Sequence, residues 1–176
     1  PKAWGITTGS QDVVVAVIDT GVDLGHPDFA GKLVSQSYDF VNEDANAQDD
    51  EGHGTHVAGI IGAATNNSFG MAGVGWNSRL MAVKVLNSNG GGSLTAVVRG
   101  ILWAADHGAD VINLSLGGPN GSGSMQSAIS SVHDRGVLVI AAAGDGYTTT
   151  PEGNEPSTLW IFEVSNSNQV GRARFT

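Results

Sequence analysis

The sequence contains no cysteine and few basic residues. Without cysteine, the chain has no disulfide bond, no thiol nucleophile and no thiolate metal site. Eight Lys and Arg residues against 17 Asp and Glu residues give a formal net charge of −9. This balance argues against a nucleic-acid partner or an anionic membrane, because phosphate groups are bound by basic patches. Acidic loops instead favour binding of cations.

The sequence also lacks an apolar run of about 18 residues and an N-terminal segment that is first basic and then apolar. We therefore expect no membrane-spanning segment, and we expect that any targeting segment has already been removed. The 176 residues are enough for one well-buried domain and too few for two. A single domain over residues 1–176 is the prediction.

The sequence does contain an alternation of short apolar runs and amphipathic segments. The apolar runs predict strands at residues 12–18, 79–86, 110–116 and 137–143, the first and last of them buried, and a weaker one at 159–164. The 3.6-residue period predicts helices at 93–107 and 125–135, and a small-residue helix buried on most sides at 53–64. Ser93 is the expected N-cap of its helix, and Gly108 and Gly136 end the second and third helices. This order predicts an α/β fold with a parallel sheet.

Two polar residues stand where elements begin or end. Asp19 follows the first strand, at the carboxyl end where parallel sheets carry functional residues, although position alone favours a turn aspartate bonded to its own backbone. His53 opens the first helix after three acidic residues, which suit the positive end of the helix dipole. An Asp–His pair would make the imidazole a general base for a hydroxyl nucleophile. The residues alone do not decide between His53 and His56 as the base.

Three motifs resemble those of the subtilisin-like serine proteases, nearest the thermitase-like branch: AVIDTG at 16–21, HGTHVAG at 53–59 and LSLGG at 114–118. They match in order and spacing, and the resemblance extends to about Gly144. It implies a three-layer, doubly wound α/β fold with a mostly parallel sheet and helices on both faces, incomplete on its C-terminal side. It also implies a secreted, monomeric serine endopeptidase in which Asp19 orients His53, the general base. His56 would then be a packed, hydrogen-bonded structural residue.

The same resemblance implies a cleft and two Ca²⁺ sites. A peptide substrate would add as a strand between two enzyme segments, Gly90, Gly91, Gly92 and Ser115, Leu116, Gly117. Without the resemblance, the glycine triplet is merely a flexible loop. The strong Ca²⁺ site would use oxygen atoms of Asp28, Ala64, Asn67, Phe69 and Met71, and the second site those of Asp39, Asn42, Asp44, Asn46 and Gln48. Composition alone describes these segments as an Asn-rich turn and a solvated acidic loop.

The sequence departs from the family pattern in several places. The family's N-terminal arm, with one calcium ligand, and its nucleophilic serine have no counterpart here, and Ser124 is expected to cap a helix. Asp145 stands where the family has an Asn that donates a hydrogen bond to the oxyanion. Three explanations are open: an altered or acid-adapted oxyanion hole, a weakened enzyme, or an Asn before Gly146 that was deamidated or misassigned. Residues 146–176 align only loosely with the family.

The leading hypothesis is a calcium-stabilised serine endopeptidase that hydrolyses peptide bonds of proteins through an acyl-enzyme. Its nucleophilic serine would lie beyond Thr176, so the expected partners are a protein or peptide substrate and the missing C-terminal part of the same domain. The alternative hypothesis is a catalytically inactive fragment or pseudoenzyme that only binds extended peptides and calcium.

Overall fold

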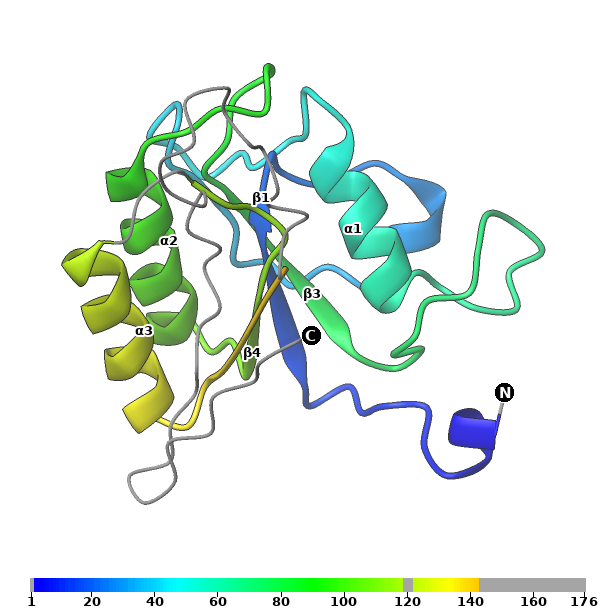
Figure 1. Cartoon of the computed structure of the whole chain (residues 1–176). Helices are drawn as coiled ribbons and strands as arrows, with labels where there is room; N and C mark the ends of the chain where they lie inside the picture. Colours follow the sequence, from blue (N-terminus) through cyan, green and yellow to red (C-terminus); the bar gives the residue numbers. More distant parts are fainter. Residues whose placement is uncertain (1, 119–121, 143–176) are drawn as a thin grey trace, which may run out of the picture.

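Figure 1 shows the chain as a computed structural model, in which residues 2–118 and 122–142 are described. Five parallel strands form one sheet in the order β2-β3-β1-β4-β5. The strands are β1 (Val14–Asp19), β2 (Tyr38–Asp39), β3 (Arg79–Lys84), β4 (Val111–Leu114) and β5 (Leu138–Ala141). The helices are α1 (His53–Gly62), α2 (Leu94–Asp106) and α3 (Gly123–Asp134), with 3-10 turns η1 (Lys2–Gly5) and η2 (Pro27–Phe29).

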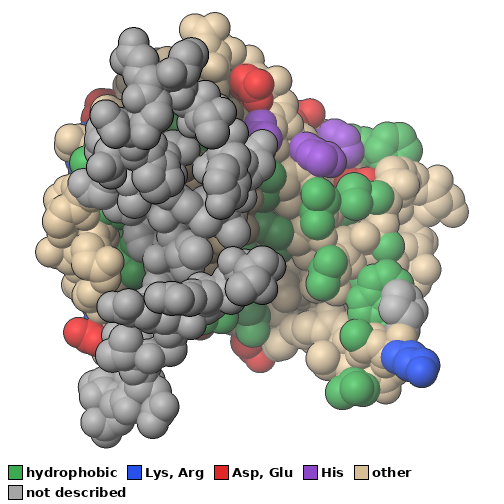
Figure 2. Space-filling view, in the orientation of Figure 1, with side chains coloured by type: hydrophobic (Ala, Val, Ile, Leu, Met, Phe, Trp, Pro, Cys, Tyr) green, Lys and Arg blue, Asp and Glu red, His purple; other side chains and the backbone are tan. Residues whose placement is uncertain are grey.

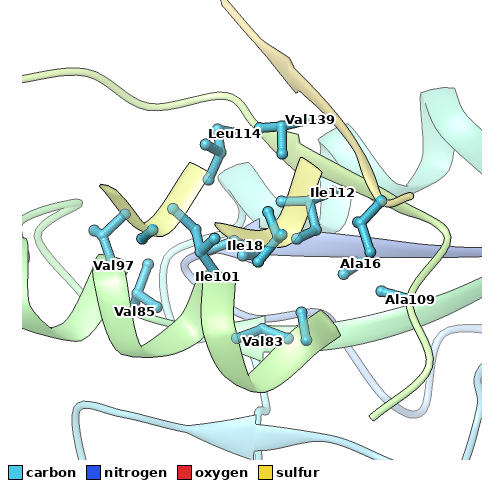
Figure 3. Packing of buried hydrophobic residues seen from close by; sticks show 14 of the residues in the cluster. Ala16, Ile18, Val83, Val85, Val97, Ile101, Ala109, Ile112, Leu114 and Val139 are labelled. Atoms are coloured by element: carbon cyan, nitrogen blue, oxygen red, sulfur yellow. The ribbon is translucent and has the colours of Figure 1, made fainter. Parts of the chain in front are cut away.

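The helices cover both faces of the sheet, and β1 lies at its centre (Figure 1). Successive side chains of a strand point to opposite faces. Ala16 and Ile18 therefore join the core under α2 and α3, part of which Figure 3 shows, whereas Val15 and Val17 pack on the side of α1. Every residue of β1 is buried, as its continuous apolar run predicts. The predicted three-layer α/β fold is confirmed.

Local signals account for the ends of the helices. The Ser93 hydroxyl accepts a hydrogen bond from the Ala96 N–H at 3.0 Å and caps α2. Gly108 and Gly136 follow α2 and α3 with φ of +88° each, which is the left-handed conformation expected after a helix. The prediction that Ser124 caps the third helix is wrong, because α3 begins two residues earlier than expected, at Gly123, and its N-cap is Ser122.

Two predictions of burial are wrong. In β5, Val139 is buried, but the side chains of Leu138 and Ile140 are 47% and 50% exposed. These two residues alternate with Val139, and no helix in the described ranges covers their side of β5, because α1 packs against β1 and β3. The helix α1 is likewise buried along one stripe of small residues, and Ile60 on its other side is exposed.

The predicted strand at 159–164 lies outside the described residues. The two-residue strand β2 has no signal in the sequence that distinguishes it from a loop. No helix within residues 2–118 and 122–142 has both the length and the apolar composition needed to cross a bilayer.

Candidate active site

Asp19 and His53 form a hydrogen-bonded pair between the end of β1 and the start of α1. The distance between His53 Nδ1 and Asp19 Oδ1 is 2.8 Å. The Asp19 side chain is fully buried, whereas the imidazole is 46% exposed. Because an ionised carboxylate only accepts hydrogen bonds, Nδ1 carries the proton, and Nε2 is left as the basic nitrogen. The pair therefore has the arrangement that a general base requires.

The surroundings of His53 favour its protonated form. The hydrogen bond to Asp19 is the largest influence and raises the pKa of His53 above its ordinary value of 6.5, and partial burial opposes it. The negative charges of Asp19, Glu51 and Asp49 raise this pKa further. Nearly all of this effect depends on groups that precede α1 or end β1, so the geometry of their junction controls the basicity of the imidazole.

Asp49 organises the first turn of α1. Its carboxylate accepts hydrogen bonds from the backbone N–H groups of Glu51, Gly52 and Thr55 at 2.9–3.0 Å, and from the Thr55 hydroxyl. Burial acts to raise the pKa of the Asp49 carboxyl, but hydrogen bonds from Thr55, Gly52 and Glu51 outweigh it and lower that pKa to about 2. From the sequence, Asp49 was expected only to lie near the positive end of the dipole of α1. Its hydrogen bonds depend on a loop conformation that the sequence does not disclose.

A buried lysine bonds the residues that follow β1 and β3 to the loop before α1. Lys84, at the end of β3, lies beside Asp19 in the register of the sheet and is fully buried. Its Nζ donates to the carbonyl oxygens of Thr20 and Leu86, at 2.6 and 2.9 Å, and to the Asp50 carboxylate. Three acceptors satisfy the three N–H bonds of an ammonium group, which explains how this charge tolerates burial.

His53 lines a cleft of about 560 Å³ that also contains both predicted substrate segments. Gly90, Gly91 and Gly92 contribute one wall, and Ser115, Leu116 and Gly117 contribute another. Within the described residues, the backbone of Ser115, Leu116 and Gly117 makes no hydrogen bond to another backbone group. Apolar side chains complete the lining, from Leu86, Leu94, Val97, Leu114 and Met125. Figure 2 shows histidine side chains beside acidic ones in the upper part of the visible surface.

Comparison with known proteins assigns the chain to a family. The model of the subtilase family matches residues 10–174. The chain belongs to this family. It is 48% identical to thermitase of Thermoactinomyces vulgaris over 86% of the chain and 53% of that relative. It is 45% identical to subtilisin of Bacillus pumilus over 96% of the chain and 62% of that relative.

A solved structure of a cold-adapted subtilisin-like serine proteinase superposes on this subtilase with a TM-score of 0.68 and 40% sequence identity. The superposition covers 77% of this chain and 48% of that structure. The subtilase chain thus spans about half the length of the relatives it matches, which include a thermophilic serine proteinase of Bacillus sp. (strain AK1).

The five residues of the predicted strong calcium site lie together in the subtilase chain. The buried carboxylate of Asp28 accepts from the Asn67 amide at 2.7 Å and from the Met71 N–H at 3.2 Å. The Ala64 N–H donates to the Asp28 carbonyl, and the Phe69 N–H donates to Asn67. Residues 65–72 enclose a hollow of about 360 Å³. A Cβ on Gly70 would lie 1.7 Å from Asp28 Oδ2, so only glycine lets the loop approach this carboxylate.

The second predicted calcium site is brought together only in part. Asp39 accepts hydrogen bonds from Asn42, it pairs through the backbone with Asp44, and Asp44 accepts from the Asn46 N–H. Gln48 instead binds Asp23 and the Leu24 N–H. No three His, Asp or Glu side chains within the described ranges gather as a metal cluster, so either site would depend on amide and carbonyl oxygens.

Three other candidates have different outcomes. The prediction of a packed, hydrogen-bonded His56 is wrong: its side chain is exposed and makes no hydrogen bond with the described residues. Ser124 is exposed, and its hydroxyl pairs with that of Ser122 at 2.7 Å. Asp145 lies outside the described residues, so its three explanations stay open.

Proposed function

We propose that this subtilase chain is part of a serine endopeptidase that hydrolyses peptide bonds of proteins through an acyl-enzyme. The observation that carries the proposal is the 2.8 Å hydrogen bond between His53 Nδ1 and the buried Asp19, at the edge of a cleft. Asp19 fixes the tautomer of His53 and stabilises the imidazolium. His53 Nε2 takes the proton of a serine hydroxyl and later gives it to the leaving amine.

We expect the nucleophilic serine in the part of the polypeptide that this sequence does not include; within residues 2–118 and 122–142, no serine forms a hydrogen bond with His53. The length of the relatives, about twice that of this chain, supports this proposal. An extended peptide would bind between Gly90–Gly92 and Ser115–Gly117, whose backbone groups can pair with those of a substrate strand. We also expect a secreted protein that acts as a monomer.

Titration with a serine-reactive phosphonate tests the proposal on the complete polypeptide that the gene encodes. We expect stoichiometric labelling of the protein. The His53→Ala variant should lose this labelling while its circular dichroism spectrum stays unchanged. The competing function is binding of extended peptides without catalysis, through the cleft that Gly90–Gly92 and Ser115–Gly117 line. A folded, full-length protein that binds peptides but takes up no phosphonate would establish that function instead.

Calcium is the proposed stabilising ion. Asp28 and the carbonyl and amide oxygens of Ala64, Asn67, Phe69 and Met71 would hold it, and Asp39, Asn42, Asp44 and Asn46 would contribute to a second site. The cradle that Gly70 forms over the Asp28 carboxylate supports the first assignment. When bound, Ca²⁺ would replace the N–H donors on Asp28 and tie the loop after α1 to η2.

The oxyanion position has its own test. An ionised Asp145 would repel a tetrahedral oxyanion, whereas an Asn or a neutral carboxyl would donate to it. Mass spectrometry of the peptide that contains residues 143–147, compared with the gene, separates the explanations. A codon for Asp would exclude deamidation, and a codon for Asn would restore the family's donor.

A further inference from the structure

Asp49 accepts five hydrogen bonds although the proposed chemistry does not use it. Three donors are backbone N–H groups at the start of α1. The other two are the hydroxyl groups of Thr55 and Thr20, and the Thr20 hydroxyl lies 2.9 Å from Asp49 Oδ1. Thr20 directly follows Asp19 at the end of β1, so Asp49 is bonded both to the strand that carries the acid and to the helix that carries the base.

Thr20 extends this link to the catalytic pair itself. Its hydroxyl donates to Asp49 and accepts from the N–H of Gly54, the residue after His53, at 2.9 Å. Its own N–H donates to Asp19 Oδ1 at 2.7 Å, the same oxygen that binds His53. Thr20 is 1% exposed, and water therefore does not substitute for these partners. The Asp19–His53 hydrogen bond thus belongs to a network of buried and partly buried hydrogen bonds, which Asp49 joins through the Thr20 hydroxyl and the first turn of α1.

Two glycines beside this network, Gly21 and Gly54, pack directly against neighbouring backbone. A Cβ on Gly54 would lie 2.1 Å from the Gly21 carbonyl oxygen, and a Cβ on Gly21 would lie 2.9 Å from the Asp49 N. Val22 adds two backbone hydrogen bonds, from its N–H to Ala47 and from the Asp49 N–H to its carbonyl. A change in the position of the Asp49 carboxylate must therefore move the end of β1 or the start of α1.

We propose that Asp49 is a positioning residue for the proposed proteolysis. Through Thr20 and the first turn of α1, Asp49 holds Asp19 and His53 at hydrogen-bond distance. This inference rests on the proposed function for its consequence in catalysis, but not for its effect on His53. The charged groups around His53 are Asp19 from β1 and Glu51 and Asp49 from the loop before α1. Lys84 and Asp50 form an ion pair on the other side of Thr20.

The substitution Asp49→Asn tests the inference, because it keeps the size of the side chain but replaces one acceptor oxygen by an NH₂ donor. The new NH₂ group then faces N–H and O–H donors to which it cannot bond. We expect this repulsion to loosen the packing between the end of β1 and the start of α1. NMR titration of the complete polypeptide should show a lower pKa for the His53 imidazole. If the protein is a protease, kcat should fall roughly 10- to 100-fold with KM little changed, as expected for a small misplacement of a base.

Asp106→Asn is the matched control, because it removes the same charge from an exposed ion pair with Arg135 on the far side of α2. It should leave the His53 pKa and kcat unchanged. Loss of the Asp49 charge lowers the His53 pKa by itself, so the positioning role is measured by the downfield NMR signal of the His53 Nδ1 proton, which reports the hydrogen bond to Asp19. A purely structural role for Asp49 would lower the melting temperature of Asp49→Asn but leave this signal of the folded fraction unchanged, and that result would overturn the proposal.

A second pair of variants decides the matter if Asp49→Asn does not fold. Thr20→Val removes the hydroxyl that connects Asp49 to Gly54, whereas Thr20→Ser keeps it. We expect the valine variant to lower the His53 pKa and the serine variant to restore it. Equal His53 pKa values in the two variants would contradict the proposed role of the Thr20 hydroxyl. The NMR readout needs no turnover, so an inactive protein with a shifted His53 would reject the protease function while supporting the role of Asp49.

Discussion

The basicity of His53 depends on one hydrogen bond between a buried carboxylate and a half-exposed imidazole. Because a general base acts only when neutral, turnover should rise with pH through the pKa of His53, which lies above 6.5. The same shift makes folding depend on pH. A group whose pKa is raised by folding stabilises the native state below its unfolded pKa, and this stabilisation disappears as pH rises through the folded pKa.

Stability measurements on the complete polypeptide and its His53→Ala variant test this dependence. Urea unfolding near pH 5.5 should show a larger loss of unfolding free energy in the variant than unfolding near pH 9, because only the protonated imidazole gains from Asp19. The substitution should also abolish turnover at both pH values. A difference in stability that does not change with pH would show that the two residues are not coupled in the folded protein.

Residue types and positions alone made Asp19 only a candidate for this site. Asp19 follows from its place at the end of a parallel strand, and His53 was distinguished from His56 only by the resemblance to a family. The structure adds the reason, since α1 turns His53 toward β1 and leaves His56 exposed. Asp49, Thr20 and Lys84 were not predicted, because their roles depend on the path of loops that bring residues 20, 49 and 84 together.

Among the elements, α1 depends most closely on its glycines. Gly54 faces the Gly21 carbonyl, where a Cβ would be 2.1 Å away, while a Cβ on Gly59 would meet only the flexible Met71 sulfur at 3.6 Å. Both lie in the same helix, so helix propensity favours alanine equally at the two positions, by roughly 0.5–1 kcal/mol.

Gly54→Ala should therefore destabilise the protein by about 1–3 kcal/mol through overpacking, whereas Gly59→Ala should be neutral or stabilising. Urea denaturation of the two variants side by side measures the difference. Gly54→Ala should also lose turnover, because the added methyl group pushes the start of α1 away from Asp19. Equal stabilities would show that the two elements do not touch at Gly54.

The two helices on the other face offer a similar comparison of caps. Ser93 accepts a hydrogen bond from the Ala96 N–H and caps α2, while the side chain of Ser122 makes no capping bond at α3. Ser93→Ala should cost about 1 kcal/mol of unfolding free energy. Ser122→Ala should cost no more than a few tenths, and thermal melting of both variants checks the contrast. A similar loss in both would mean that serine acts here through something other than its cap.

Periodicity and caps predicted β1, β3, β4, β5 and the three helices, with ends that differ by at most two residues. These features depend on neighbours in sequence, which is why they can be predicted. Exposure cannot be predicted in this way, since Leu138 and Ile140 have the composition of a buried strand yet lie on a side that no described helix covers. Which face of a strand is covered depends on the whole arrangement of elements.

At the scale of the whole molecule, the proposed calcium site connects segments that are far apart in sequence. Asp28 belongs to η2, and its partners Asn67 and Met71 belong to the loop after α1. An ion that binds only the folded state stabilises it by RT ln(1 + [Ca²⁺]/Kd), or about 2.7 kcal/mol at a hundredfold excess over Kd. The melting temperature should therefore rise with calcium concentration and fall with a chelator.

The change of melting temperature with calcium concentration, and not the melting temperature in one condition, identifies the ligands. Asp28→Asn loses hydrogen-bond acceptors even without the ion, so it should melt lower in chelator and should also fail to respond to added calcium. Asp44→Asn tests the second loop in the same way, and a reduced but persistent response would assign the stronger site to Asp28. Asp134→Asn, an exposed acid at the end of α3, should respond as the unsubstituted protein does. If Asp28→Asn kept the full response, calcium would have to bind elsewhere, and the cradle at Gly70 would only shape the loop.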